Sequence, residues 1–278
     1  MRVLITGVTG FLGSSLATHL STLGHEVRGT TTGPSRAVPV STFRHRLGDP
    51  VEDAMFAGTD VVVHAAYDLS PGSGQTNVAG TIALAEAARK RGVTRQIFIG
   101  SYSAHPGAVT EYGRTKAELQ AWFLSAGLTV VRPGLVIGRG GLYARMAEVV
   151  RKHRVVPVVC PGALVPVIAL GDLTRCMAGL IDAGIAGQVR LYLDERVTMR
   201  MLMREIRRSV GSRAVLVPVP YAVARAGLAL LLAARVRPPL GRDNLEGLRA
   251  NQGRAEAGDL SSYVRSPLGL AEMVDAAR

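Results

Sequence analysis

Two residues with proton-transfer chemistry stand four positions apart in the segment YGRTK, at Tyr112 and Lys116. On a helix this spacing places both side chains on one face. A free tyrosine has a pKa of about 10, and a neighbouring ammonium group favours its phenolate and so lowers that pKa. The pair therefore predicts a general acid and base, with Tyr112 moving the proton and Lys116 tuning and positioning it.

Hydroxyl groups that could assist this chemistry follow the apolar run 96–100, at Ser101 and Ser103. A serine hydroxyl beside Tyr112 would hydrogen-bond a substrate oxygen while the tyrosine transfers its proton. Both serines are close enough in the chain to fill this role, so both are candidates.

A glycine-rich turn near the start of the sequence could bind a phosphate-bearing cofactor. Gly7, Gly10 and Gly13 stand at GxxGxxG spacing between a predicted strand, Arg2–Thr6, and a predicted helix, Phe11–Leu23. Gly7 permits a tight turn, Gly10 lets the backbone approach a pyrophosphate, and Gly13 lets the helix pack closely on the strand. The helix N-terminus adds unpaired N–H groups and a positive dipole end, so we expect a dinucleotide to bind here.

The elements that position these residues alternate short apolar runs with amphipathic segments, which is typical of βαβ units and a parallel sheet. Further strands are predicted at Glu26–Thr30, Arg44–Leu47, Asp60–Ala65, Gln96–Gly100 and Leu128–Arg132, and further helices at Val51–Ala57, Gln75–Arg91 and Thr110–Ala126. Gly24, Gly92 and Gly127 each follow a helical pattern, where a left-handed C-terminal cap is expected. The predicted fold class is α/β, a Rossmann doubly wound parallel sheet with a small C-terminal α/β substrate lobe.

After Pro133 the alternation of strand and helix patterns becomes less regular. No repeat or low-complexity linker separates the two halves of the chain. Helices are predicted at Leu142–His153, Asp172–Asp182, Thr198–Val210 (with Thr198 as the cap) and Tyr221–Arg235, and a strand at Val189–Leu193. We expect residues 1–135 to form the dinucleotide-binding Rossmann core. Residues 136–278 should form a smaller substrate lobe packed on that core, not an independent domain.

Composition places the chain among globular proteins. Its 278 residues are 47% hydrophobic and 19% charged, enough for a full α/β core. Cys160 and Cys176 stand in apolar surroundings and make no disulfide framework, so a cytoplasmic location is expected. No secretory signal is recognised, and the apolar run within Ala226–Ala234 is too short to span a bilayer, so stable membrane insertion is not expected.

The net charge of +12 raises the question of nucleic-acid binding. Residues 1–150 hold 14 Lys/Arg against 10 Asp/Glu, and residues 151–278 hold 19 against 11. The arginines are scattered through apolar helices without a nucleic-acid motif, so we expect a basic surface around an anionic cofactor and no nucleic-acid partner. The apolar helix Tyr221–Arg235 has basic ends and a thin polar face. Buried core or an oligomer contact, such as a homodimer, is favoured there over a membrane-surface anchor.

Several motifs in the first half follow the order of one known family. They are TGVTGFLG at residues 6–13, Gly48-Asp49, His64-Ala65-Ala66, NVAGT at residues 77–81, and Arg132-Pro133-Gly134. Together with Tyr112 and Lys116 they resemble the extended (or atypical) short-chain dehydrogenase/reductase superfamily, of the NAD-dependent epimerase/dehydratase-like kind. The resemblance covers residues 1–140 and continues weakly to Asp172.

The resemblance implies an NAD(P)-dependent enzyme acting on a small-molecule substrate, with Ser101, Tyr112 and Lys116 as its catalytic set. Ser101 is preferred to Ser103 because the family places its serine two residues beyond the last apolar residue of the strand. For His64 and Arg132 a structural role is favoured. The implied cofactor-binding residues are Gly7, Thr9, Gly10, Phe11, Leu12, Thr31, Arg36, Asp49, Ala65, Ala66, Asn77, Lys116 and Pro133, with Asp172 as a helix N-cap and no metal site.

Cofactor choice depends on the segment after the second strand. Residues 30–36 contain no acid to hold the ribose hydroxyls of NAD, whereas Thr31 and Arg36 could take a 2′-phosphate. NADP is therefore predicted over NAD.

Three functions remain open on this evidence. Reduction of a carbonyl in a small metabolite or natural-product intermediate ranks first. A nucleotide-sugar epimerase, dehydratase or 4-ketoreductase ranks second. Such relatives usually have a longer insertion between the serine and the tyrosine, and Tyr102 and Ser103 replace the Asp-Glu pair that dehydratases need. A non-enzymatic NADP-sensing regulator or complex subunit ranks third, because the Ser/Tyr/Lys set is complete.

Overall fold

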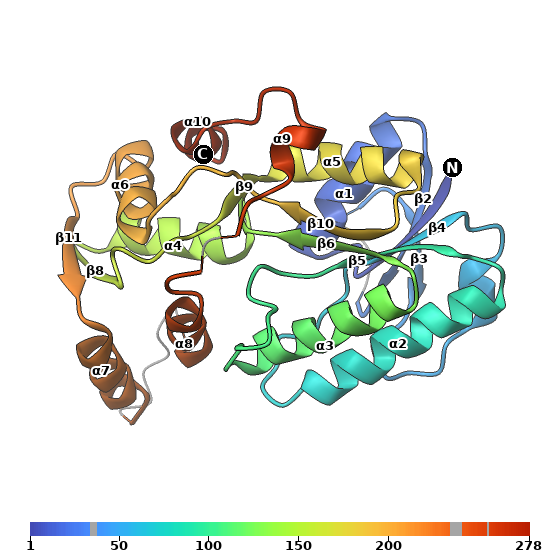
Figure 1. Cartoon of the computed structure of the whole chain (residues 1–278), viewed down its shortest axis with the longest axis horizontal. Coiled ribbons are helices and arrows are strands. Elements are labelled where there is room, and N and C mark those ends of the chain that lie inside the picture. The colour runs from blue at the N-terminus through green and yellow to red at the C-terminus, as the bar shows by residue number, and fades with distance from the viewer. Residues whose placement is uncertain (34–37, 234–240, 255) are drawn as a thin grey trace.

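The computed structural model describes residues 1–33, 38–233, 241–254 and 256–278. Its centre is a seven-stranded parallel sheet in the order β10-β6-β5-β4-β1-β2-β3 (Figure 1). The order reverses between β1 and β4, where a doubly wound sheet binds its ligand. The strands are β1 (Arg2–Thr6), β2 (Glu26–Thr31), β3 (Ser41–Arg44), β4 (Val61–His64), β5 (Arg95–Ile99), β6 (Thr129–Pro133) and β10 (Gly187–Leu191).

Helices cover both faces of this sheet (Figure 1). In β1, Ile5 packs toward one helix pair and Leu4 toward the other, so the strand is buried on both sides and reads as a continuous apolar run. The first pair is α1 (Phe11–Thr22) with α5 (Leu170–Ala183), and the second is α2 (Gly74–Lys90) with α3 (Glu111–Ser125). The predicted doubly wound Rossmann fold is confirmed.

The remaining elements build a smaller lobe with a core of its own. Two short parallel ribbons, β7 with β9 and β8 with β11, share this core with α4, α6 and α10. Their bounds are β7 (Leu135–Ile137), α4 (Gly141–Lys152), β8 (Val155–Val159), β9 (Val167–Ala169), α6 (Met199–Ser209), β11 (Val215–Val219) and α10 (Leu270–Ala276). The other helices are α7 (Tyr221–Ala233), α8 (Arg242–Ala250) and the short α9 (Leu260–Tyr263).

The second half of the chain does not form the lobe alone, so the predicted division after residue 135 needs a correction. β10 pairs with β6 in the main sheet, and α5 packs beside α1 on that sheet. Leu260 of α9 is fully buried in the same core. Because β10 pairs with β6, the backbone edge of β6 that faces away from β5 is hydrogen-bonded and not exposed. The lobe is therefore interleaved with the Rossmann core.

Two predicted elements in the first half differ in detail. β3 begins three residues before its predicted start, because its register pairs Ser41 with Arg28 of β2. Leu47 is buried in the core from the loop after β3, so its apolar character does not mark a strand. The predicted helix at residues 51–57 is a single 3-10 turn, η1 (Asp53–Phe56).

The prediction of buried core for the helix Tyr221–Arg235 is wrong. α7 lies at the periphery beside α8 (Figure 1), with Val223 60% and Leu230 72% exposed. A uniformly apolar helix lacks the polar face that would distinguish a buried helix from one that lies at the surface. Residues 234 and 235 lie outside the described residues, and an oligomer contact stays a prediction. Within the described part of the chain, no helix is both long and apolar enough to cross a membrane.

Glycines shape several turns as predicted. Gly24, Gly92 and Gly127 have φ values of +83°, +82° and +72°, the left-handed conformation expected after a helix. Gly13 serves close packing instead, since a Cβ atom on it would lie 2.4 Å from the carbonyl oxygen of Gly7. The first turn of α1 therefore packs directly on the turn after β1.

Gly13→Ala is expected to lower the free energy of unfolding by about 1–3 kcal/mol, because the added methyl group overlaps main-chain atoms. Gly179→Ala is the matched control, since Gly179 is an exposed residue of α5 and a Cβ atom there meets nothing within 4 Å. That variant should be as stable as the wild type or slightly more so. Urea denaturation measures both. Wild-type stability of Gly13→Ala would contradict the packing described here.

Candidate active site

The glycine-rich turn after β1 is shaped for close approach of a ligand. Gly7 has a φ of +66°, and a Cβ atom on it would lie 2.8 Å from the Cα of Ala66. The Thr6 hydroxyl accepts hydrogen bonds from the N–H groups of Ala65 and Ala66, each at 3.0 Å, which joins the ends of β1 and β4. α1 begins directly after Gly10, and the first N–H groups of a helix have no partner within it. This cradle fits the pyrophosphate of a dinucleotide.

The side chains of Phe11 and Leu12, the two residues after Gly10, pack within the fold. Phe11 lies against the loop between β7 and α4, where a Cβ atom on Gly140 would be 2.3 Å from its ring. Leu12 packs against the core on the α1 face. Their main-chain N–H groups, and not their side chains, would face a bound cofactor, and the cofactor contacts of Phe11 and Leu12 stay predictions.

Threonine hydroxyls fix the end of β2 against the glycine-rich turn. Thr30 accepts a hydrogen bond from the N–H of Gly7 at 3.2 Å, and the hydroxyl oxygens of Thr9 and Thr31 lie 3.1 Å apart. The structure thus brings Thr9 and Thr31 together, as a shared cofactor contact requires. Arg36 lies outside the described residues, so its predicted contact with a 2′-phosphate stays a prediction.

Asp49 and Asn77 both hold loops in this structure. Asp49 is exposed, and its carboxylate closes a turn by accepting a hydrogen bond from the N–H of Arg46 at 3.1 Å. Asn77 is fully buried and makes two hydrogen bonds of 2.8 Å with the backbone of Asp68. It therefore fixes the loop that follows Ala66. Cofactor contacts of Asp49 and Asn77 stay predictions.

The first turn of α3 is anchored before it presents Tyr112. The hydroxyl of Thr110 caps the helix by accepting a hydrogen bond from the N–H of Gly113 at 3.0 Å. The carboxylate of Glu111 accepts a hydrogen bond of 2.7 Å from the N–H of Gly74, the first residue of α2. These two bonds fix the direction in which α3 starts.

Ser101, Tyr112 and Lys116 meet at the carboxyl end of β5. Ser101 lies close enough to Tyr112 to influence its pKa. The Lys116 nitrogen donates a hydrogen bond of 2.7 Å to the carbonyl of Ile99, the last residue of β5. Burial raises the pKa of Tyr112, and the nearby Ser101 hydroxyl opposes that shift. Burial lowers the pKa of Lys116 to about 7.

The predicted lowering of the Tyr112 pKa by Lys116 is not seen in this geometry. The Lys116 nitrogen is bonded to the main chain of β5, and burial disfavours its charge, so desolvation is the largest influence on Tyr112. Lys116 acts here as a tether between α3 and β5. Its tuning of Tyr112 stays a prediction for the enzyme with cofactor bound.

The two candidate serines make different contacts. The Ser101 hydroxyl accepts a hydrogen bond of 3.1 Å from the N–H of Ser103. The Ser103 hydroxyl accepts a hydrogen bond of 3.1 Å from the side-chain amide of Asn251, in the segment between α8 and α9. Ser103 is thus engaged by a distant segment, which favours Ser101 as the partner of the tyrosine, and the choice between the two serines stays a prediction.

The loop that carries both serines is supported by the end of β6. Arg132 is buried, pairs with Glu256 at 3.0 Å and donates a hydrogen bond of 3.2 Å to the carbonyl of Ala104. The carbonyl of Pro133 accepts a hydrogen bond of 2.9 Å from the N–H of Tyr102. Both residues thus position the loop after β5. A direct contact of Pro133 with the cofactor stays a prediction.

His64 and Asp172 make contacts within the fold. His64 is buried with Nε2 2.8 Å from the side-chain oxygen of Gln96, and burial lowers its pKa to about 4, so its ring is neutral. Asp172 is not a helix N-cap as predicted, because α5 begins two residues earlier and its N-cap is Ala169. The buried Asp172 carboxylate pairs with Arg175.

Tyr67 is a residue of the site that sequence reasoning missed. Its ring contacts that of Tyr112 edge-on, with centroids 5.2 Å apart, and its centroid lies 4.8 Å from the Lys116 nitrogen. Burial raises the pKa of Tyr67 to about 12, and the nearby Thr115 hydroxyl opposes the shift. Its position directly after the HAA motif at the end of β4 was the available signal, because parallel sheets bind ligands at that edge.

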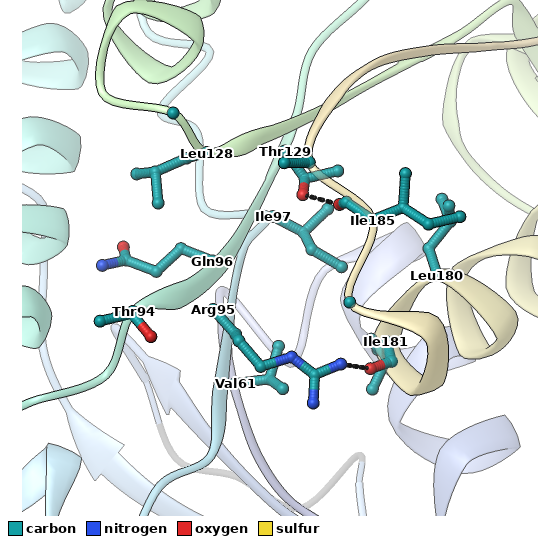
Figure 2. Close-up of a pocket in the computed structure, with 13 residues that line it drawn as sticks. Val61, Thr94, Arg95, Gln96, Ile97, Leu128, Thr129, Leu180, Ile181 and Ile185 are labelled. Carbon is teal, nitrogen blue, oxygen red and sulfur yellow. Dashed lines mark hydrogen bonds between the residues drawn. The ribbon is translucent and has the colours of Figure 1, made fainter.

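Cavities lie at both ends of the strands. The one at the carboxyl ends has a volume of about 260 Å³ and is lined by Tyr102, Leu164, Pro166, Tyr192, Arg254 and Glu256, among others. The other, of about 70 Å³, lies at the amino ends of β5 and β6 (Figure 2). There Arg95 and Thr129 donate hydrogen bonds to the carbonyl groups of Ile181 and Ile185. This second cavity is at the wrong edge of the sheet to serve Tyr112.

The sequence matches the model of the NAD dependent epimerase/dehydratase family over residues 3–149, more than half of the 278-residue chain. The chain belongs to this family. The glycine-rich turn and the Ser101, Tyr112 and Lys116 set all fall within the matched residues, and the resemblance seen in the motifs is confirmed. The protein is therefore an enzyme of the NAD dependent epimerase/dehydratase family. Its choice between NAD and NADP stays a prediction.

Two curated relatives are similar to this family member. Sterol demethylase protein B of Methylococcus capsulatus is 27% identical over 271 residues, which span 83% of this chain and 81% of that protein. The 3-beta-hydroxysteroid dehydrogenase of Mycolicibacterium neoaurum is 35% identical over 122 residues, 38% of this chain and 33% of that protein.

Solved structures of the family share the fold. UDP-glucose 4-epimerase of Thermus thermophilus in complex with NAD has a TM-score of 0.68 and 24% identity, covering 90% of this chain and 97% of that one. Human epimerase family protein SDR39U1 with NADPH has a TM-score of 0.76 and 20% identity, covering 100% and 99%.

The buried lysine predicts a pH dependence of stability. The pKa of Lys116 is about 7 in the folded protein, against about 10.4 for an unfolded chain. Between these values the unfolded chain binds more protons, so the free energy of unfolding contributed by this group rises with pH. Thermal unfolding of the cofactor-free Lys116→Met variant should therefore show a smaller rise from about pH 7 to pH 10 than the wild type does.

Lys90→Met is the matched control, because Lys90 is an exposed residue at the end of α2 and should leave the wild-type slope unchanged. Equal slopes for Lys116→Met and the wild type would show that Lys116 keeps its charge on folding.

Proposed function

We propose that this enzyme exchanges a hydride between a nicotinamide cofactor and the carbonyl or alcohol carbon of its substrate, with Tyr112 as the acid and base. The placement of Tyr112 and the buried Lys116 one turn apart on α3, with Lys116 bonded to β5 two residues before Ser101, carries the proposal. These side chains lie at the carboxyl end of β5, the edge of the sheet where the glycine-rich turn would bind the cofactor.

Each residue has one task when a carbonyl is reduced. The bound nicotinamide supplies the hydride to the carbonyl carbon. Ser101 donates a hydrogen bond to the substrate oxygen and orients it. Tyr112 donates its hydroxyl proton to the same oxygen, which completes the alcohol. In the oxidation direction Tyr112 accepts that proton.

Lys116 has donors left for the cofactor. Among the described residues, Ile99 alone accepts a hydrogen bond from its nitrogen, and an ammonium group has three protons to donate. The remaining donors would hold hydroxyl groups of the nicotinamide ribose, as the family resemblance implies. Such acceptors favour the charged form of Lys116, and that charge would bring down the pKa of Tyr112, which burial has raised.

An apolar ring alcohol or ketone of the sterol class is the proposed substrate. Both curated relatives carry names from sterol and steroid chemistry. The larger cavity adjoins the catalytic loop. Tyr102, Leu164, Pro166 and Tyr192 on its wall would contact an apolar ring system, and the charged residues that also line it would bind polar groups of the substrate. Such a substrate belongs to the natural-product carbonyl compounds expected from the sequence.

Nucleotide-sugar chemistry is the second candidate, because structures of such enzymes share this fold. Dehydration is the least supported form of it. Tyr102 is buried against the segment after α8, and Ser103 is bonded to Asn251, so neither position supplies a carboxyl group beside Ser101. Epimerisation and 4-ketoreduction require little beyond the Ser/Tyr/Lys set and remain outcomes of the tests below.

Turnover should depend on the Tyr112 hydroxyl. Tyr112→Phe should bind the cofactor normally while turnover falls by about two orders of magnitude or more, the scale of a lost general acid. Tyr143→Phe is the matched control, since Tyr143 is a buried tyrosine of the lobe core and should keep near-wild-type turnover. Ser101→Ala should resemble Tyr112→Phe, and Ser103→Ala should resemble the wild type.

The assay is a panel of steroid and small alicyclic alcohols and ketones, followed by the absorbance of the reduced cofactor. Wild-type turnover in Tyr112→Phe would overturn the role of this residue. Loss of turnover in Ser103→Ala, with Ser101→Ala active, would transfer the serine role to Ser103.

NADP should bind more tightly than NAD, by about tenfold or more, because residues 30–36 contain no acid for the ribose hydroxyls that NAD exposes. The hydroxyl of Thr31 stands at the end of β2 beside Thr9, where it is also bonded to the backbone of Gly33. Fluorescence titration with NADPH and NADH measures both dissociation constants in one preparation. Tighter binding of NADH would reverse this choice.

A further inference from the structure

The ribbon formed by β8 and β11 exposes an apolar face. Val156 and Val158 point into the lobe core, and the alternate residues of β8 lie on the outer face. On that face Val155 is 61% and Val215 is 58% exposed, and the two are paired across the ribbon. Val217, next but one along β11, is also exposed. A strand with one face in solvent usually carries polar residues on that face. The outer face of this ribbon is apolar instead.

The helix that follows β11 in the chain, α7, is also apolar and exposed. Every residue of α7 from Tyr221 to Leu230 is exposed or half-buried, although Arg225 is the sole charged residue among them. Figure 1 shows β8, β11 and α7 together at one end of the molecule, away from α2 and α3. Exposed apolar residues gathered at one end of a protein mark a site of interaction with another protein or with a membrane.

Positive charge borders this surface. From Ile206 to Arg242 the sequence has seven arginines and no aspartate or glutamate. Arg154 lies beside Val215, whose N–H donates a hydrogen bond of 2.8 Å to the Arg154 carbonyl. Arg154, Arg213 and Arg225 are exposed, and within the described ranges none of them has an acidic partner. A protein or membrane that covers the apolar residues would therefore lie close to these positively charged side chains, and negative charge on it would be favourable.

We infer that the outer face of β8 and β11, together with α7, docks on the surface of a bilayer that contains anionic lipids. The docking surface consists of Val155, Val215, Val217, Val223 and Leu230 with Arg154, Arg213 and Arg225. The apolar side chains enter the boundary between headgroups and acyl chains, and the arginines pair with lipid phosphates. Docking of this kind is peripheral and needs no spanning helix.

A second copy of the chain fits this surface less well. A two-fold interface apposes the same patch on both subunits, so it brings the three arginines of one copy toward those of the other. Like charges brought together in this way oppose association. An anionic bilayer offers the opposite charge to every one of them. The inference rests on exposure and charge and is independent of the proposed reaction.

The test is co-sedimentation of the full-length protein with vesicles of phosphatidylglycerol and phosphatidylcholine, and with vesicles of phosphatidylcholine alone. Binding to the anionic vesicles should be about tenfold stronger or more, and it should weaken as salt is added. Leu230→Glu and Arg213→Glu should each weaken binding to the anionic vesicles by about tenfold. Leu69→Glu is the matched control, because Leu69 is also 72% exposed but lies in the loop between β4 and α2, and it should bind as the wild type does.

Circular dichroism and thermal unfolding verify that each variant is folded, and the two substitutions lie in different elements, so one misfolded variant leaves the other to decide. Absence of the protein from the anionic vesicle pellet would overturn the inference, as would wild-type binding by both folded variants. Light scattering that shows a dimer, dissociated by Leu230→Glu, with no vesicle binding would assign the same surface to a second copy instead.

Discussion

The hydrogen bond from Lys116 to the carbonyl of Ile99 joins the two elements on which the site depends. Ile99 ends β5 two residues before Ser101, and Lys116 lies one helical turn after Tyr112 on α3. The bond therefore sets where the serine and the tyrosine stand relative to each other. It is buried, so losing it would leave polar groups unpaired inside the protein, which is unfavourable. Because burial lowers the pKa of Lys116 to about 7, the charge on this tether responds to what binds beside it.

A distant part of the chain completes the catalytic loop. The loop after β5 contacts the segment between α8 and α9 through the Tyr102 hydroxyl, which donates to the carbonyl of Arg254 at 3.0 Å, and through Ser103 with Asn251. Arg132 at the end of β6 joins Glu256 of that segment to the same loop. The second half of the chain therefore helps to position the catalytic loop, because the segment between α8 and α9 holds the backbone that carries Ser101.

The sequence predicts the Rossmann core well because its signals are local. The glycine spacing, the helix caps at Gly24, Gly92 and Gly127, and the alternating apolar runs all act within a few residues, and the family match confirms the fold they indicate. Contacts between distant segments have no such signal. The pairing of β10 with β6 and the hydrogen bond between Asn251 and Ser103 appear only when the chain is folded. The exposure of α7 is of the same kind, because a uniformly apolar helix is compatible with burial and with a surface.

Transfer of isotope from the cofactor tests the central claim of net hydride exchange most directly. The enzyme is incubated with a steroid ketone and reduced cofactor that carries deuterium at the transferred position, and the product is analysed by mass spectrometry and NMR. Net hydride transfer predicts one deuterium on the new carbinol carbon and one equivalent of oxidised cofactor for each alcohol formed. Failure to label any ketone, together with isomerisation of a nucleotide sugar without net oxidation of the cofactor, would contradict it.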